Sequence, residues 1–464
     1  DGPMSTTYSG VRTTGIYCRP GCGGRPLARN VTPFRSAAAA EAAGLRACFQ
    51  CRPYRTSDLE SWVDGPELVC RAVRLIIDGY LDRHTEQELA GRIGVSARHL
   101  RRLFAEQVGA TPDQVARSRR AHFARRLLDD TDLSLTDVAF AAGFGSVRQF
   151  NRTMQDTFRA SPKELRARRR KADRLAADGG LTLRLPFTPP LDWPELLAWF
   201  GGRTIDGSEV VDGDTYRRTI VVDGQPGVIE VGPGGDDHLL LRAHLPYWDG
   251  LIHVVQQVRR MFALDHEPGA DAERFDGDPK LAPLVTARPG LRVPGSWDGF
   301  EVGVRAILGQ QVTVAGARTM AGRLVERLGT PVPGLTELGL THTFPPPEVL
   351  AEADLDGLGL TGARIQALRA FAAAVRDGAV RLDGSVSLDD LVASIVALPG
   401  LGDWTAHYVA LRLGEPDAFP AGDLGLRKAL ANGTVPTARQ VEDRAEAWRP
   451  WRAQAAIHLW ALRP

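Results

Sequence analysis

The chain has 464 residues, of which 43% are apolar and 24% are charged. This composition is that of an ordinary globular protein, and it excludes a wholly disordered, collagen-like or coiled-coil chain. At roughly 100–200 residues per domain, the length predicts about three domains. Because no apolar run approaches the ~18 residues of a membrane span and no signal peptide is evident, we expect a cytoplasmic protein without a membrane partner.

The formal net charge of +1 hides an uneven distribution. Residues 1–174 contain 30 Lys and Arg against 19 Asp and Glu, whereas residues 175–464 contain 27 against 37. The first segment therefore has the basic character of a polyanion-binding protein, and the rest must bind its ligand through a local site. A bias of genome composition would explain why arginine greatly outnumbers lysine, but it does not explain the asymmetry.

The cysteines are concentrated near the start of the chain. Cys18 and Cys22 form one close pair, Cys48 and Cys51 form another, and only Cys70 follows. Two such pairs predict a tetrahedral zinc site with four thiolate ligands. The alternative is a disulfide framework, which a reducing cytosol disfavours. Cys70 opens an apolar-periodic helix, and we expect it to be a buried small hydrophobe.

The segments around the cysteine pairs, residues 11–20, 29–31 and 43–53, resemble the N-terminal zinc domain of the Ada family of bacterial alkylation-response regulators. The resemblance implies that Cys18 accepts a methyl group from a methylated DNA phosphate. This chemistry is physically sensible, because a zinc-held sulfur stays a thiolate at neutral pH and the phosphotriester is neutral. Methylation removes one negative charge from the zinc centre and so lowers its repulsion from DNA, which is a chemical switch.

The family carries a further helix and strand before this segment, whereas here ten residues precede Val11. The first four, Asp1–Met4, are typical of a tag remnant before a start methionine. We therefore expect a zinc domain that is shortened at its N-terminus.

Two similar units follow, at residues 85–104 and 134–158. In each, a capped helix ends at a glycine, Gly94 or Gly143, and a serine begins the next helix, which is the pattern of a helix-turn-helix. With the Ser161–Leu165 closing segment, they resemble the AraC/XylS DNA-binding domain. The second helices would direct six side chains at the major groove or its phosphates, with solvated arginines on a helical bundle as the alternative interpretation. These side chains are Arg98, Arg101, Arg102, Arg148, Gln149 and Arg152.

After a charged linker, the pattern changes to alternating apolar strands at residues 181–186, 216–222, 227–231 and 238–244. Helical stretches near 193–200 and 248–263 complete a small α+β domain. Beyond about residue 270 the pattern is helical, with an amphipathic face that we expect to be formed by Phe300, Val304, Ile307, Leu308 and Val312. The resemblance to Ada ends at the linker, because no later cysteine could accept an alkyl group.

A Leu-Pro-Gly-Leu-Gly hairpin at residues 398–402 separates two predicted helices. Gly400 and Gly402 would let a nucleic-acid backbone approach, and the N–H groups of the following helix would receive a phosphate. Asp423 follows that helix after a short loop. This hairpin-then-aspartate arrangement resembles the helix-hairpin-helix superfamily of base-excision glycosylases, and residues 181–464 resemble its AlkA family, 3-methyladenine DNA glycosylase II.

The resemblance to AlkA implies a TATA-binding-protein-like α+β domain followed by an all-α domain. Bifunctional relatives have a lysine where this chain has Trp404, and iron-sulfur relatives have four C-terminal cysteines, so a monofunctional hydrolase without an iron-sulfur cluster is implied. Asp423 would stabilise an oxocarbenium-like sugar and align or deprotonate the attacking water. The alternative role of Asp423 is that of a helix N-cap, which we expect Asp403 to be.

The base pocket is also implied by the resemblance. Trp404, Tyr408 and Trp460 stand where AlkA lines its pocket, and Trp199 stands where AlkA has a phenylalanine; core packing is the alternative for each. Cation–π attraction of ~1–2 kcal/mol per ring would favour cationic alkylated purines. Gln311 takes the place of the leucine wedge that fills the vacated stack. Relatives also hold a monovalent cation through backbone carbonyls near Leu398 and Leu401.

We therefore predict a multidomain DNA alkylation repair and response protein that binds one Zn²⁺ and double-stranded DNA. It would act as a monomer on the nucleoid, with RNA polymerase as a partner. One alternative is a transcriptional regulator whose glycosylase fold is only a DNA clamp, and another is a glycosylase that the front domains merely deliver to DNA. The predicted segments are a zinc domain (1–58), a double helix-turn-helix domain (66–171), a linker (172–180), an α+β domain (181–268) and a helix-hairpin-helix domain (269–464).

Overall fold

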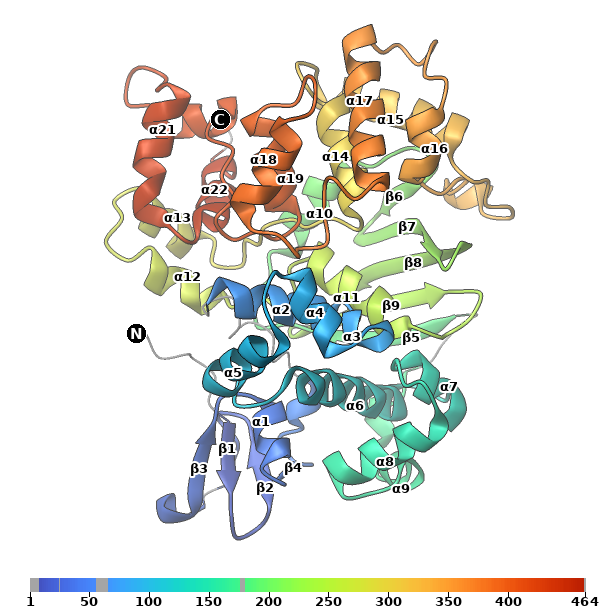
Figure 1. Cartoon of the computed structure of the whole chain (residues 1–464), viewed down its shortest axis with the longest axis vertical. Coiled ribbons are helices and arrows are strands. Elements are labelled where there is room, and N and C mark those ends of the chain that lie inside the picture. Colours follow the sequence, from blue (N-terminus) through green and yellow to red (C-terminus); the bar gives the residue numbers. More distant parts are fainter. Residues whose placement is uncertain (1–7, 25, 56–65, 176–179, 463–464) are drawn as a thin grey trace. The chain divides into compact units, whose positions relative to one another are not determined.

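The computed structural model describes residues 8–24, 26–55, 66–175 and 180–462 (Figure 1). The chain divides into two compact units, Asp1–Pro186 with Tyr247–Gln256, and Phe187–Pro246 with Gln257–Pro464. This division does not separate the individual predicted domains, whose boundaries stay predictions. The tag-like residues Asp1–Met4 and residues 176–179 of the predicted linker lie outside the described residues.

The first unit begins with a four-stranded sheet in the order β3-β1-β2-β4. β2 and β4 are parallel neighbours, with Tyr17 opposite Ala47. Because Cys18 and Cys48 each follow these paired residues, the sheet brings the two cysteine pairs to the same end. The elements are β1 (Tyr8–Val11), β2 (Ile16–Cys18), η1 (Ala28–Asn30), β3 (Val31–Phe34), α1 (Ala37–Ala42), β4 (Arg46–Ala47) and η2 (Pro53–Arg55).

Helices form the rest of the first unit as far as the linker, and the predicted capping pattern is confirmed. Thr85 caps α4 with a capping box, and the serines that precede α5, α7, α8 and α9 each accept a hydrogen bond from the first turn. Gly94 and Gly143 have φ near +80°, as the turn of a helix-turn-helix needs. The elements are α2 (Glu67–Ile77), α3 (Tyr80–Arg83), α4 (Glu86–Arg92), α5 (Ala97–Gln107), α6 (Pro112–Asp130), α7 (Leu135–Ala141), α8 (Val147–Phe158), α9 (Pro162–Ala167), η4 (Lys171–Asp173) and β5 (Leu181–Pro186).

The α4/α5 and α7/α8 pairs lie on either side of the 19-residue helix α6 in the sequence, and α6 contacts the second pair directly. Leu89, Leu100 and Phe104 are fully buried, as are Phe150 and Phe158. These apolar side chains leave the polar faces of α5 and α8 toward solvent. Cys70 lies on α2 and is only partly buried, so it is more exposed than expected.

The second unit contains an antiparallel sheet in which β9, β8, β7 and β6 follow in order. Three of its strands were predicted, whereas β6 (Glu209–Asp212) was not, because four residues that include two acidic side chains carry little apolar alternation. α10 (Trp193–Gly201) precedes the sheet. The other elements are β7 (Thr215–Val222), β8 (Gln225–Pro233), β9 (His238–His244) and α11 (Leu251–Met261), whose second half belongs to this unit.

The remaining helices share one large core, which includes Phe300, Val304, Ile307 and Leu308 as predicted. The expectation for Val312 is wrong: it lies beyond the end of α14 and is 39% exposed, because the helix stops at Leu308 and the chain turns. The elements are α12 (Pro268–Arg274), α13 (Leu281–Ala287), α14 (Gly299–Leu308), α15 (Val314–Leu328), η5 (Thr336–Leu338), α16 (Pro347–Glu352), α17 (Gly362–Arg376), α18 (Leu388–Val396), α19 (Asp403–Arg412), α20 (Leu424–Ala429), α21 (Ala438–Ala445), η6 (Glu446–Trp448) and α22 (Arg452–Trp460).

A buried ion-pair cluster joins the sheet of the second unit to α14. Arg218 of β7, which is 2% exposed, lies 2.6 Å from Glu301 and 3.4 Å from Glu209. Arg305 pairs with both carboxylates, at 2.7 Å from Glu301. Burial acts to raise the pKa of Glu301, but Arg218 and Arg305 outweigh it and lower that pKa to about 2. The Glu301 carboxylate is therefore charged at neutral pH, and both buried carboxylates depend on these arginines as ion-pair partners.

We expect Arg218→Ala to destabilise the second unit by about 3 kcal/mol or more, because it leaves buried carboxylates with one cation fewer. Urea unfolding followed by tryptophan fluorescence measures this. The matched control is Arg376→Ala, because Arg376 pairs with the exposed side chains of Glu352 and Asp377, so its loss should leave the unfolding midpoint nearly unchanged. Equal unfolding midpoints for the two variants would contradict the expectation.

Candidate functional site

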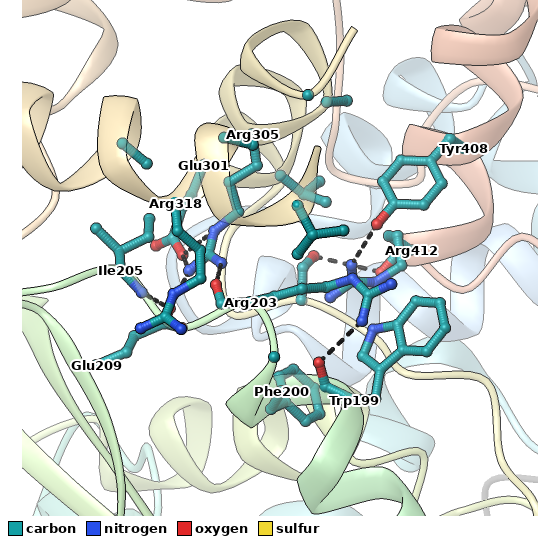
Figure 2. A pocket seen from close by; sticks show the side chains of 18 of the residues that line it. Trp199, Phe200, Arg203, Ile205, Glu209, Glu301, Arg305, Arg318, Tyr408 and Arg412 are labelled. Carbon is teal, nitrogen blue, oxygen red and sulfur yellow. Dashed lines mark hydrogen bonds and ion pairs between the residues drawn. The ribbon is translucent and has the colours of Figure 1, made fainter. Parts of the chain in front are cut away.

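A cavity of about 680 Å³ opens in the second unit between α10, α14, α15, α19 and the start of α20. Figure 2 shows part of its lining, with Trp199, Phe200, Tyr408 and Arg412 on one side and Glu209, Glu301 and Arg305 on the other. The pocket residues predicted from the sequence, Trp199, Trp404, Tyr408 and Trp460, all line it together with Asp423. The cavity therefore combines one carboxylate with several aromatic rings.

Asp423 is partly buried on the wall of this cavity and is held by three hydrogen bonds. Its Oδ1 accepts from the indole N–H of Trp460 at 2.8 Å and from the backbone N–H of Leu426 at 3.1 Å, and its Oδ2 accepts from the indole N–H of Trp404 at 3.2 Å. The bond to Leu426 makes Asp423 the N-cap of α20. The two roles considered for Asp423 are therefore compatible in one conformation.

Two pairs of aromatic rings form the wall around the carboxylate. Trp404 and Tyr408 lie one helical turn apart on α19 and stack with ring centroids 5.3 Å apart and planes at 11°. Trp460, near the end of α22, meets Trp199 of α10 at 5.7 Å and 37°. Because the indole N–H groups of Trp404 and Trp460 bind Asp423, these rings also fix the orientation of the acid.

Arg412 lies one turn after Tyr408 on α19 and binds the tyrosine hydroxyl. Its Nη1 donates to the tyrosine oxygen at 2.9 Å, and its other nitrogens donate to the carbonyls of Pro294 and Gly295. Burial acts to raise the pKa of Tyr408, but the positive charges of Arg412 and Arg203 outweigh it and lower that pKa. Sequence patterns missed Arg412, although its spacing of four residues from Tyr408 on a helix is a usable signal.

The hairpin before α19 leaves the first turn of that helix uncapped by any side chain. Gly400 has φ of +75°, and Gly402 is the N-cap, with no side-chain hydrogen bond. The expectation that Asp403 is the N-cap is wrong, because Asp403 is already the first helical residue and its side chain is exposed. The backbone N–H groups of this turn can therefore bind an anion.

The turn between α14 and α15 carries the predicted wedge. Gln311 is exposed and has φ of +56°, a conformation that side-chain-bearing residues rarely adopt. The neighbouring Gln310 donates from Nε2 to the carbonyl of Gly400 at 3.2 Å and to Thr405 Oγ1 at 3.1 Å, and Arg364 donates to the carbonyl of Gln310 at 2.5 Å. These contacts tie the turn to the hairpin, a link that the sequence did not predict.

In the first unit, the thiol sulfurs of Cys18, Cys22, Cys48 and Cys51 lie within 4.8 Å of one another. A tetrahedron of sulfurs around Zn²⁺ has edges of about 3.8 Å, so these residues fit a four-thiolate site. All five cysteines of the chain are unbridged. The four-cysteine zinc site is therefore supported over the disulfide alternative.

The pKa values of the clustered cysteines also indicate that a cation belongs among them. Burial and the neighbouring cysteines raise the pKa of Cys18 well above its ordinary value, and burial raises that of Cys51 to about 11. For Cys48, burial acts in the same direction, but backbone N–H groups of Cys51 and Gln50 outweigh it and lower the pKa. A cation such as Zn²⁺ beside these sulfurs would favour their thiolate forms.

The six side chains predicted to face DNA lie on α5 and α8 and are all exposed: Arg98, Arg101, Arg102, Arg148, Gln149 and Arg152. Four of them have local partners: Arg101 pairs with Glu86 at 2.6 Å, Arg102 Nη2 lies 3.1 Å from His99 Nδ1, Arg152 pairs with Asp156 at 3.9 Å, and Gln149 accepts from the N–H of Gly145. Within the described part of the chain, Arg98 and Arg148 make no such side-chain contact. They are the arginines most available to a ligand.

Contacts inside the first unit link the cysteine cluster to α6, which sequence patterns did not reveal. Tyr17, which precedes Cys18, donates to Glu41 at 2.7 Å, and Glu41 lies 2.7 Å from His122 of α6. After Cys51, Arg52 pairs with Asp173 at 2.8 Å. The cluster is therefore braced against the helical part of this unit.

Family models match the chain in four consecutive segments. They are the metal-binding domain of Ada (residues 5–54), a helix-turn-helix domain (89–168), the AlkA N-terminal domain (182–298) and the HhH-GPD superfamily of base-excision DNA repair proteins (304–452). This order is the one that the sequence predicted. Of the described helices, none has the length and apolar character needed to cross a membrane.

Relatives cover the chain almost completely. It is 40% identical over 455 residues to the probable bifunctional transcriptional activator/DNA repair enzyme AlkA of Mycobacterium tuberculosis, covering 97% of this chain and 91% of the relative. It is 34% identical to DNA-3-methyladenine glycosylase 2 of Escherichia coli, covering 60% of this chain and 95% of that protein.

Among solved structures, the 3-methyladenine DNA-glycosylase of Archaeoglobus fulgidus matches with a TM-score of 0.52 and 23% identity, covering 60% of this chain and 97% of that one. This likeness concerns the fold alone. Together with the four family segments and the relatives, it leads to one assignment: the chain belongs to the family of bifunctional transcriptional activator/DNA repair enzymes AlkA, with an Ada-type zinc domain, a DNA-binding helix-turn-helix domain and a DNA glycosylase domain.

Proposed function

We propose that the second unit hydrolyses the N-glycosidic bond of alkylated purines, such as 3-methyladenine and 7-methylguanine, in double-stranded DNA. The observation that carries the proposal is the position of Asp423 on the wall of the 680 Å³ cavity, between the indole N–H groups of Trp404 and Trp460. A carboxylate fixed at an aromatic cavity suits a reaction in which positive charge develops on the sugar of an extruded nucleotide.

In this proposal Asp423 stabilises the oxocarbenium-like sugar and aligns or deprotonates the attacking water. N3- and N7-alkylated purines are already cationic, so the leaving base needs little help from a general acid. The position two residues after the hairpin is Trp404, which has no amine to form a Schiff base with the sugar. The reaction therefore ends with a free base and an abasic site.

The remaining pocket and wedge residues are given the roles that the resemblance to AlkA implies. The rings of Trp199, Trp404, Tyr408 and Trp460 offer π faces to the base. Gln311, held in a strained turn by its neighbours, would enter the vacated stack, with its amide free to hydrogen-bond the orphan base. The first turn of α19, after Gly400 and Gly402, would bind a DNA phosphate, and the adjoining carbonyls near Leu398 and Leu401 a monovalent cation.

The first unit would bind promoter DNA through α5 and α8, and we expect Arg98→Ala and Arg148→Ala each to weaken binding about five- to tenfold. If each arginine neutralises one phosphate, the slope of log affinity against log salt also falls by about one. Fluorescence anisotropy at several salt concentrations, on duplexes that the protein selects from a random pool, measures both quantities. Arg117→Ala is the control, because Arg117 is exposed on α6 and paired with Asp113. Effects no larger than those of the control would contradict this assignment.

For the cysteine cluster, we propose a second activity. A Zn²⁺ bound by Cys18, Cys22, Cys48 and Cys51 would keep the sulfurs as thiolates. The sulfur of Cys18 then attacks the methyl carbon of a neutral DNA methylphosphotriester, the carbon–oxygen bond breaks, and an ordinary phosphodiester leaves. The product is a methylated cysteine, so each protein molecule reacts once. Any resulting promoter activation would involve RNA polymerase, with the protein acting as a cytoplasmic, nucleoid-associated monomer.

The direct test of the glycosylase proposal is release of 3-methyladenine from methylated DNA by the full chain. Release at a rate well above the spontaneous rate is the expected result. If no base is released, the alternative of a transcriptional regulator with a glycosylase fold as its DNA clamp is favoured. If base is released but no promoter is activated and Cys18 stays unmethylated, the front domains serve only for delivery to DNA.

A further inference from the structure

Arg203 lies inside the cavity on one of its aromatic walls. It follows the end of α10, and its guanidinium carbon is 3.7 Å from the centroid of the Trp199 ring. Its Nη1 donates to the carbonyl of Trp199 at 3.1 Å, and its own carbonyl accepts from Arg305 at 2.7 Å. In Figure 2, Arg203 lies between the Tyr408 and Arg412 side of the cavity and the Glu209 and Glu301 side. A cation therefore already occupies a π face of the pocket.

One hydrogen-bond donor beside Arg203 has no acceptor in the described ranges of the chain. The indole N–H of Trp199 is buried, in a residue that is 6% exposed, and has no hydrogen-bond partner among the residues that the structure describes. The charge of Arg203 also reaches Tyr408, where it contributes to lowering the pKa of the hydroxyl. A buried donor without an acceptor is costly, so this side of the pocket suits a ligand that brings one.

Two consequences follow for a base that enters the cavity. A cationic base attracted to the Trp199 face must displace a guanidinium or tolerate a like charge beside it, which is unfavourable in a partly desolvated site. A neutral base with a carbonyl oxygen or an unalkylated ring nitrogen can instead accept from Trp199 or Arg203. The same side chain thus acts in opposite directions on the two kinds of base.

We propose that Arg203 is a specificity-determining residue of the glycosylase, which handicaps cationic bases relative to neutral bases that carry a hydrogen-bond acceptor. This inference rests on the proposed function and refines its substrate preference. It places Trp199 among the donors and leaves Trp404, Tyr408 and Trp460 as the rings that attract a cationic base. In this account the positive charge of Arg203 opposes the binding of a cationic alkylated purine, and only three of the four aromatic rings favour it.

The test compares excision of 7-methylguanine, which is cationic, with excision of hypoxanthine, which is neutral and has a carbonyl oxygen, from otherwise identical duplexes. Single-turnover rates are measured for the full chain, for Arg203→Gln, which removes the charge but keeps a polar side chain, and for Arg203→Lys, which keeps the charge. We expect Arg203→Gln to raise the ratio of the 7-methylguanine rate to the hypoxanthine rate about tenfold. Arg203→Lys should leave the ratio within about twofold.

The possible outcomes separate the claims. If Arg203→Gln changes both rates by one common factor, Arg203 only supports the fold and the inference is overturned. A fall in the ratio would overturn it as well, with Arg203 then assisting the cationic base. If the wild-type chain releases neither base, the proposed function itself fails, and the inference falls with it. The affinity of each variant for abasic-site DNA shows that the hairpin surface is intact.

Discussion

Asp423→Asn should abolish base release, lowering the rate of 3-methyladenine excision by about a thousandfold or more. The substitution removes the negative charge that would stabilise the sugar cation, and of the three hydrogen bonds that Asp423 accepts it removes only the one from Trp404, because an amide nitrogen cannot accept. Asparagine is as good an N-cap as aspartate, so its side-chain oxygen can still accept from Leu426 and Trp460. Single-turnover release of the free base from methylated duplex DNA measures the effect.

A second substitution separates charge from structure at this position. Asp423→Ala removes both the charge and the cap, and it should in addition destabilise α20 by about 1 kcal/mol. Equal rates for the two variants, together with unchanged unfolding of Asp423→Asn, would assign the loss to the charge. An Asp423→Asn variant that releases base at the wild-type rate would refute the role given to this carboxylate.

Cys18→Ser should prevent methyl transfer from methylphosphotriester DNA completely, while leaving base excision by the second unit unchanged. The serine hydroxyl stays protonated at neutral pH and is a poor nucleophile for a methyl carbon. Mass spectrometry of the protein after incubation with the methylated DNA detects the transferred methyl group, and the zinc content of both proteins is measured in parallel.

The control is Cys70→Ser, which removes a partly buried thiol on α2 outside the cysteine cluster. That variant should accept one methyl group like the wild-type chain. If Cys18→Ser still gains a methyl group on one of the other cysteines, or if the wild-type chain gains none at Cys18, the proposed second activity is wrong.

Local spacing made much of the fold predictable. The serine and glycine positions around α5 and α8 carry their own capping and turn requirements, so those helices could be placed from the sequence. The close spacing of Cys18 with Cys22 and of Cys48 with Cys51 likewise predicted a shared metal site. Val312 was misplaced because its apolar character continues the period of α14, whereas the backbone leaves the helix at Gly309.

The contacts that complete the cavity could not be predicted in the same way. Arg203 and Arg218 belong to segments without a recognisable motif, and their partners lie up to about a hundred residues away in the sequence. Polar side chains buried by tertiary contacts leave no periodic signal, because burial is decided by the fold rather than by the local pattern. Asp423 was predictable because of its spacing from the hairpin, but its bonds to Trp404 and Trp460 were not.

The most direct test of the central claim is an experimental structure of the chain bound to duplex DNA that contains a cationic abasic-site analogue. The account predicts that the analogue is turned out of the duplex into the cavity and that an Asp423 carboxylate oxygen lies about 3–4 Å from the position of the anomeric carbon. It also predicts that Gln311 fills the vacated stack. An Asp423 carboxylate directed away from the sugar, with the analogue left within the duplex, would contradict the account.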